Sequence, residues 1–337
     1  MIEKKEKRIM SKIVNGQSLP NMPWEECPKD YNRPVWRYSL NPVIKRHPNK
    51  VADRVFNSAV VPFGDEFVGV FRCDKNDGCP FLFVGHSKDG IHFEIEETPI
   101  HFVDEKGEPI PDTEWQYDPR VIPIDGKYYV VWCDEFDGAT ISIAETTDFK
   151  TFTKYDNPFL PNNRNGVLFP RKVNGHYLML SRPSDIGHTP FGDIFMSQSD
   201  DLSFWGKHRI ILKRGWAWWN SLKIGGGPAP IEIEEGWLIF IHGVQNTCNG
   251  YVYSMGGIIV DREDPTKILY QCKDYLLAPE ELYETSGFVA NVVFPTSTLV
   301  DADSGRIAIY YGSADTYTAL AFTTVEKVVN YIKENSI

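Results

Sequence analysis

The stretch GKYYVVWC, residues 126–133, decides the fold, because its pattern of a turn followed by strand-forming residues recurs along the chain. Four other segments align with it without gaps: DEFVGVFR (65–72), GHYLMLSR (175–182), EGWLIFIH (235–242) and SGRIAIYY (304–311). Their first residues lie 61, 49, 60 and 69 positions apart, so the repeating unit is about 60 residues long. Five such units account for most of the 337 residues.

Each of the five segments has strand-like neighbours on both sides. An apolar run precedes it, as in YDPRVIPI (117–124), and a second run with a hairpin-type turn follows it, as in ISIAETTDFKTFTK (141–154). Three to four strands per unit, repeated five times, predict an all-β protein, a five-bladed β-propeller. A β-sandwich or jelly roll is the alternative, but neither explains a five-fold repeat.

The domain organisation follows from this repeat. We expect an N-terminal extension over residues 1–22 and a single propeller domain over residues 23–337. The tail VEKVVNYIKENS (325–336) is predicted to be a short C-terminal helix, because its apolar residues have helical spacing. These apolar positions are Val325, Val328, Val329 and Ile332.

Composition excludes several classes of function. A net charge of -11 makes nucleic acid a poor partner, and no run of 18 apolar residues or secretory leader is present, so we expect a cytoplasmic protein without membrane contact. The 6 cysteines form no CxxC pair, and no cluster of His, Cys and carboxylates has ligand spacing. We therefore expect no metal and no organic cofactor.

Residues that differ between units at an equivalent position are candidates for function, because the fold does not require the difference. The last column of the alignment contains Arg72, Cys133, Arg182, His242 and Tyr311. Three of these are basic in an acidic protein, which predicts a focused anion pocket where the units converge. Nearby loops add Arg164, Asn165 and Lys223. Such a set suits a phosphate dianion.

A second column, at the openings of the innermost strands, contains Asn57, Asp118, Phe169, Gly227 and Phe294. Asp118 is its only carboxylate. Three roles are open for Asp118: an ion pair with Arg120, the cap of a turn, or an acid that faces the channel. Asp315, which follows the last inner strand, is a candidate ligand anchor.

Aromatic side chains that could line a sugar site are His188, Tyr251, Tyr253 and Phe294. The stretch GWAWWN (215–220) contains Trp216, Trp218 and Trp219, which either line an extended glycan subsite or pack within a blade.

At these residues the chain resembles glycoside hydrolase family 130, the inverting β-mannoside phosphorylases, from about PWEECP (23–28) to the C-terminal helix. The resemblance is carried by RVFNSAVV (54–61), YDPRV (117–121), NRNGVLFPRK (163–172), RPSDIGHTPFGDIF (182–195), CNGYVYS (248–254) and IAIYYGSADT (307–316). It is strongest to the branch that acts on β-1,4-mannooligosaccharides and mannosyl-N-acetylglucosamine ends.

The resemblance implies a propeller enzyme in which Asp118 is the sole protein acid, delivering its proton through the mannose 3-hydroxyl, and inorganic phosphate is the nucleophile and co-substrate. Phosphate would be held by Arg164, Asn165, Arg182, Lys223 and His242. The mannoside would be held by Asn57, Ser58, Arg72, Tyr117, His188, Tyr251, Tyr253, Phe294 and Asp315.

Three other functions stay open from the sequence. One is a β-mannosidase, in which Asp134 or Glu135 would serve as the general base. The others are a mannosylglucose phosphorylase and a glycan-binding propeller without catalysis. The expected partners are a β-mannoside and phosphate, and self-association into a homo-oligomer is left open.

Overall fold

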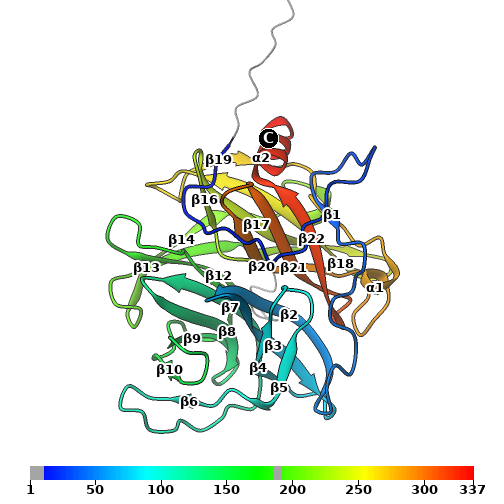
Figure 1. Ribbon diagram of the computed structural model, residues 1–337. Coiled ribbons are helices and arrows are strands. Elements are labelled where there is room, and N and C mark those ends of the chain that lie inside the picture. Colours follow the sequence, from blue (N-terminus) through cyan, green and yellow to red (C-terminus); the bar gives the residue numbers. More distant parts are fainter. Residues whose placement is uncertain (1–10, 185–191) are drawn as a thin grey trace, which may run out of the picture.

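Five antiparallel sheets surround a common centre in the computed structural model, which describes residues 11–184 and 192–337 (Figure 1). Blade 1 consists of β2 (Ala52–Phe63), β3 (Glu66–Lys75), β4 (Pro80–Ser87) and β5 (Glu94–Pro99). Blade 2 consists of β7 (Gln116–Ile124), β8 (Lys127–Glu135), β9 (Ala139–Thr146), β10 (Phe152–Lys154) and β6 (Phe102–Val103), the last paired in parallel. Blade 3 consists of β11 (Asn163–Leu168), β12 (Tyr177–Pro183), β13 (Ile194–Ser199) and β14 (Trp205–Leu212).

The last two blades show two variations on this plan. Blade 4 consists of β15 (Lys223–Gly226), β16 (Ile231–Ile233), β17 (Gly236–Thr247), β18 (Gly250–Val260) and β19 (Ile268–Gln271). Its inner strand is split into β15 and β16, because the intervening GPAP segment contains two prolines, which cannot donate to the sheet. Blade 5 consists of β20 (Val293–Asp301), β21 (Arg306–Ser313), β22 (Tyr317–Thr324) and β1 (Trp36–Arg37). An early strand, β1, therefore closes the ring.

The predicted five-bladed propeller is confirmed by the packing. Five apolar clusters fill the five spaces between neighbouring blades. Within β8, Val130 and Trp132 face blade 1, whereas Tyr129 and Val131 face blade 3. Both faces of the strand are buried, which explains why residues 128–132 are apolar throughout rather than alternating.

Three helical segments complete the described residues: η1 (Trp218–Asn220), α1 (Leu282–Thr285) and α2 (Val325–Glu334). The predicted C-terminal helix is confirmed as α2, whose four predicted apolar residues are all buried in the cluster between blades 4 and 5. Thr324 caps its first turn by accepting a hydrogen bond from the Lys327 amide. Within the described part of the chain, no helix is long and apolar enough to cross a membrane.

The described part of the N-terminal segment lies against blades 4 and 5. Ile13 forms a bridge with Ile233, Gln17 forms one with Asp301, and Leu19 and Met22 are buried. The residues from 11 to 22 thus contribute to the packing of the propeller.

Candidate active site

A β-bulge at the same position in three inner strands positions the channel-facing residues. In β2, β7 and β11 two residues oppose one on the next strand, and the first of the two has a positive φ: Asn57 (50°), Asp118 (54°) and Asn165 (55°). Asn and Asp tolerate this conformation better than other non-glycine residues. The bulge also turns the strand, so that a polar side chain replaces a core side chain at this point.

The bulges correct one expectation from the sequence. The column was expected to hold within one register step, and this is true of Gly227, since the ladder places Gly226 at the position of Asn57 and Asp118. Phe169 and Phe294 are wrong by more than one step, because Asn165 and Thr296 occupy that position. The extra bulge residues shift the count along each inner strand, which an ungapped comparison misses. Asp118 is still the only carboxylate in the corrected column.

The equivalence of the residues in the last column of the alignment is confirmed by the strand pairing. Each of Arg72, Cys133, Arg182, His242 and Tyr311 lies opposite the residue that precedes the bulge position. Their side chains do not form one anion pocket, however. Arg182 and His242 contact each other, Arg72 is paired with carboxylates, and Tyr311 is buried with its hydroxyl donating to Glu284 at 2.8 Å.

The Asp118 carboxylate is held by two donors from blade 1. Its Oδ1 accepts hydrogen bonds from Asn57 Nδ2 and from Arg72 NH1, both at 2.9 Å. Arg120 does not pair with this carboxylate. Its NH1 donates to the main-chain carbonyls of Asp118 and Pro119 at 3.1 Å, and its Nε donates to Gly227 O at 2.7 Å. Asp118 and Arg120 therefore form no ion pair with each other. Arg120 instead holds the main chain of the bulge that carries Asp118.

Arg120 also borders a cavity that lies apart from the predicted site residues. It is buried, and burial lowers its pKa to about 10. The cavity, of about 470 Å³, is lined by the far ends of the inner strands and by residues 15–17, and none of the described residues predicted for acid catalysis, phosphate or sugar lines it.

Asp315 lies on the Arg72 side of the site. Its pKa is raised to about 6, chiefly by burial; Arg72 opposes this shift and the nearby Asp118 adds to it. Ser58 is fully buried, with its hydroxyl bonded to Phe56 O at 3.4 Å and its own carbonyl accepting from Thr296 at 2.6 Å.

A group of cations lies on the blade 3 and blade 4 side. Arg164 and Arg182 are directly opposite each other on β11 and β12, and their positive charges act on Lys223. Burial, followed by these two arginines, lowers the pKa of Lys223 to about 8. Within residues 11–184 and 192–337 none of the three has a carboxylate within ion-pair distance. Arg182 is buried and Arg164 and Lys223 are half-buried, so three such cations without a carboxylate partner among these residues indicate a site suited to an anion.

His242 contributes no positive charge to this group. Arg182 NH1 lies 2.9 Å from His242 Nε2, and a guanidinium can only donate, so the imidazole accepts and is neutral. Burial, and then Arg182, lowers the pKa of His242 well below its ordinary value. The sequence-based view of His242 as a third cation is therefore wrong for this structure; it orients Arg182.

Aromatic residues connect the two sides. Tyr117 accepts a hydrogen bond from Arg164 Nε at 3.1 Å, while its ring lies 5.1 Å from the Arg72 guanidinium. The ring centres of Phe294 and His242 lie 4.4 Å apart, with the ring planes tilted by 39°. Lys223 lies 5.3 Å from the ring centres of both Tyr251 and Tyr253. His188 falls outside the described residues.

The GGG sequence is explained by close packing beside these cations. A Cβ on Gly225 would lie 2.4 Å from His242 Cε1 and 3.1 Å from Arg182 NH1. Gly226 and Gly227 are similarly close to Val167 and to the Phe240 carbonyl. The glycines thus leave room for side chains of the site.

Two further sequence-based candidates belong to the core. Asp134 is fully buried and bonded to Lys154 at 2.7 Å and to Ser142 at 2.8 Å, so it is not free to act as a base. Trp219 is fully buried against Gly243 and Gly256, where an added Cβ would collide with its ring, and Trp216 donates to Cys272 O. Trp218 is 56% exposed and packs edge-on against Tyr275.

Sequence reasoning missed Arg54 and Asp74. They are cross-strand partners on β2 and β3, and Asp74 Oδ1 accepts from Arg72 Nε at 2.9 Å. The available signal was the spacing of Arg72 and Asp74, since alternate residues of a strand share a face.

The family model described as β-1,4-mannooligosaccharide phosphorylase, glycoside hydrolase family 130, matches residues 16–334. The chain belongs to glycoside hydrolase family 130. A β-1,4-mannooligosaccharide phosphorylase of Ruminococcus albus is 52% identical over 334 residues, which cover 97% of this chain and 99% of the relative. A β-1,2-mannobiose phosphorylase of Listeria innocua is 34% identical over 261 residues, covering 75% and 69% of the two chains.

Among solved structures, the β-1,2-mannobiose phosphorylase from Listeria innocua in complex with β-1,2-mannobiose superimposes with a TM-score of 0.78. The match has 27% sequence identity and covers 89% of this chain and 99% of that one. This family 130 chain therefore shares the whole propeller with a mannoside phosphorylase.

Proposed function

We propose that this protein is an inverting β-1,4-mannoside phosphorylase, which uses inorganic phosphate to release α-mannose 1-phosphate from the non-reducing end of a mannooligosaccharide or mannosyl-N-acetylglucosamine chain. The observation that carries the proposal is a single bulge-mounted carboxylate, Asp118, beside Arg164, Arg182 and Lys223, three cations that no carboxylate of residues 11–184 and 192–337 pairs with. Membership of the family and the likeness to the Ruminococcus albus enzyme support it.

In the proposed mechanism, Asp118 is the general acid. Its proton reaches the leaving glycosidic oxygen, directly or through a sugar hydroxyl, while phosphate attacks the anomeric carbon from the opposite face. Asn57 and Arg72 fix the position of the carboxylate, and Arg120 fixes the main chain that carries it. A second carboxylate to activate water is not required, because phosphate is itself the nucleophile.

Arg164, Asn165, Arg182 and Lys223 are assigned to phosphate, with His242 orienting Arg182. The side chains of Asn57, Arg72 and Asp315 are assigned to the terminal mannose, with Ser58 supporting them from within the bulge. Tyr117, His188, Tyr251, Tyr253 and Phe294 are assigned to the sugars. We expect no metal and no organic cofactor to be needed.

The competing function is hydrolysis by the same fold. The burial and pairing of Asp134 argue against its use as a base, and the cations opposite Asp118 would bind an anionic nucleophile better than they would activate water. A mannosylglucose phosphorylase would differ from the proposed enzyme only in its acceptor sugar. A glycan-binding propeller without catalysis would form no product.

The test is to incubate the purified protein with β-1,4-mannobiose, β-1,4-mannotriose, mannosyl-N-acetylglucosamine and mannosylglucose, with and without phosphate. We expect mannose 1-phosphate in equal amount to the shortened acceptor, only with phosphate, and faster with the first three substrates than with mannosylglucose. Free mannose formed at full rate in phosphate-free buffer would identify a hydrolase and overturn the proposal.

A further inference from the structure

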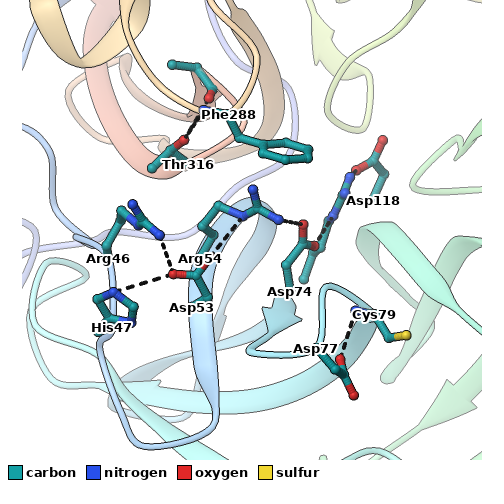
Figure 2. Close-up of polar contacts among 12 residues, drawn as sticks. Arg46, His47, Asp53, Arg54, Asp74, Asp77, Cys79, Asp118, Phe288 and Thr316 are labelled. Atoms are coloured by element: carbon teal, nitrogen blue, oxygen red, sulfur yellow. Dashed lines mark hydrogen bonds and ion pairs between the residues drawn. The ribbon is translucent and has the colours of Figure 1, made fainter.

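A chain of alternating charges leads from Asp118 along blade 1 to the surface. Arg72 contacts both Asp118 and Asp74 at 2.9 Å, Asp74 contacts Arg54 at 3.0 Å, and Arg54 lies 3.6 Å from Asp53. Asp53 in turn pairs with Arg46 at 2.6 Å. Figure 2 shows Asp74 between Arg54 and the side of the site that holds Asp118.

Arg72 is also in contact with two aromatic rings. Its guanidinium lies 4.1 Å from the ring centre of Phe56 and 5.1 Å from that of Tyr117. Cation–π contacts attract the guanidinium as a whole but do not select which of its N–H groups points at Asp118. The hydrogen bond of its Nε to Asp74 makes this selection, because it leaves NH1 directed towards Asp118.

Asp74 and Arg54 are buried, with their charged groups turned to each other. Asp74 is 2% exposed, and its two oxygens are taken by Arg72 and Arg54. Arg54 is 7% exposed and is covered by Phe288, whose ring centre lies 3.7 Å from the guanidinium. Phe288 is fixed by its amide, which donates to Thr316 at 2.8 Å (Figure 2).

Such burial has a cost that packing alone does not require. A buried carboxylate and a buried guanidinium are destabilising unless each is paired, and apolar side chains would fill the same space more favourably. The pair is therefore explained better by what it does to Arg72 than by a contribution to stability.

We propose that Asp74 and Arg54 are positioning residues for the reaction: they hold the Arg72 guanidinium in the orientation in which it fixes Asp118. The inference depends on the proposed role of Asp118 as the general acid. Asp74 acts directly on Arg72, and Arg54 acts by fixing Asp74.

Asp74→Asn tests the first step. The substitution keeps the shape but removes the charge, so Arg72 is held less firmly and its positive charge is shared with one carboxylate fewer. We expect kcat to fall about 10- to 100-fold, as for other displacements of a positioned group, while the affinity for inorganic phosphate changes less than about two-fold, since the cations of blades 3 and 4 are untouched.

The pH dependence of kcat distinguishes positioning from damage to the fold. Removing the charge of Asp74 changes the charge balance around Arg72, which contacts the proposed acid, so the pH profile of kcat should differ in shape from that of the wild type, whereas partial unfolding would lower kcat without this change in shape. The other charged or titratable groups that face Asp118 are Tyr117, Arg120, Cys133, Arg164, Arg182, Tyr253 and Asp315. Those that face Asp74 are Arg54, Cys73 and Asp315. Measuring kcat at saturating mannoside and phosphate limits the profile to groups that titrate in the ternary complex.

Asp77→Asn is the matched control, because Asp77 is exposed on the same β3–β4 hairpin and bonds only to its own turn and to Lys75. It should leave kcat and the pH profile unchanged. A folded Asp74→Asn protein with the wild-type kcat and pH profile would overturn the proposal. An equal loss of phosphate affinity would also overturn it, since the effect would then not act through Arg72.

A double-mutant cycle tests Arg54. Arg54→Lys keeps the charge but loses the planar group, and should lower kcat less than Asp74→Asn does. If Arg54 acts through Asp74, the double variant should be no slower than Asp74→Asn alone. Additive losses would overturn the role of Arg54. Asp118→Asn separates the failure of the proposed acid from the failure of the positioning role. If Asp118→Asn remains active, Asp118 is not the acid. If Asp118→Asn is inactive but Asp74→Asn has normal activity, only the positioning role of Asp74 is refuted.

Discussion

Arg164 and Arg182 lie directly opposite each other on neighbouring strands, and no carboxylate of the described residues neutralises either of them. Like charges in this arrangement repel each other. An anion bound between them would relieve this repulsion, so the arrangement suits the phosphate site that we propose.

Arg182→Ala should weaken phosphate binding by about 30- to 5,000-fold, because a desolvated charge contact of roughly 2 to 5 kcal/mol is lost. Calorimetric titration of phosphate into the wild type and the variant measures the effect. Mannoside binding in phosphate-free buffer serves as the control and should change much less. Unchanged phosphate affinity would remove Arg182 from the phosphate site.

Asp118→Asn should lower kcat by about 10² to 10⁴, the usual contribution of a general acid. The asparagine oxygen can still accept from Asn57 and Arg72, so the fold and phosphate affinity should be retained. Initial rates of mannose 1-phosphate release give the result. Near-normal turnover by the folded variant would show that another group supplies the proton.

Phosphate affinity should depend on pH through Lys223. Its pKa is lowered to about 8, chiefly by burial, so the ammonium group loses its proton as the pH rises through 8, and phosphate should bind more weakly from pH 7 to 9. Lys223→Met should bind phosphate more weakly at pH 7 and lose this dependence. The ratio kcat/KM for phosphate, measured over that range, checks both expectations; an identical slope in the variant contradicts them.

Asp315→Asn should stabilise the protein at high pH. The pKa of Asp315 is raised to about 6 in the fold from 3.8, so the folded state binds this proton more tightly than the unfolded chain does. Stability is therefore lost as the pH rises through 6, and the asparagine avoids that loss. Thermal unfolding should show a higher Tm for the variant at pH 8 and no gain at pH 4, together with a higher KM for the mannoside. A lower Tm at pH 8 would contradict the argument.

Gly225→Ala should impair phosphate binding, because the new Cβ would lie 2.4 Å from the His242 ring and displace it from Arg182. Gly206→Ala is the control, since an added Cβ there meets nothing within 4 Å. The phosphate KM of both variants measures the difference. Equal values would mean that the ring can shift without consequence.

The sequence predicts the number of blades because each middle strand must be apolar on both faces. Residues such as Tyr129 and Trp132 have neighbours on either side in a ring of sheets, and this requirement repeats five times. The residues in the last column of the alignment are equivalent, as predicted, because the middle strands contain no inserted residue between the turn and this column.

The inner strands were harder to align, because their bulges insert residues that hydrophobic patterning does not reveal. The phosphate-side assignment of Asn165 came from the family resemblance, whereas its equivalence to Asp118 appears only from the strand pairing and its φ of 55°. The partners of Arg72 and Arg120 depend on side-chain directions at these bulges. An ion pair between Asp118 and Arg120 was one of the roles left open by the sequence, but the arginine that contacts the Asp118 carboxylate is Arg72, from another blade.

Closure of the ring by β1 has a consequence for biosynthesis. Trp36 pairs with Phe322, so one of the earliest strands to leave the ribosome has no partner until almost the entire polypeptide has emerged. Blades 1 to 4 can stack on one another during translation, but the fifth sheet remains incomplete until then. Contacts between such distant residues slow folding, so the nascent chain has to keep β1 free of other pairings while the ring is still open.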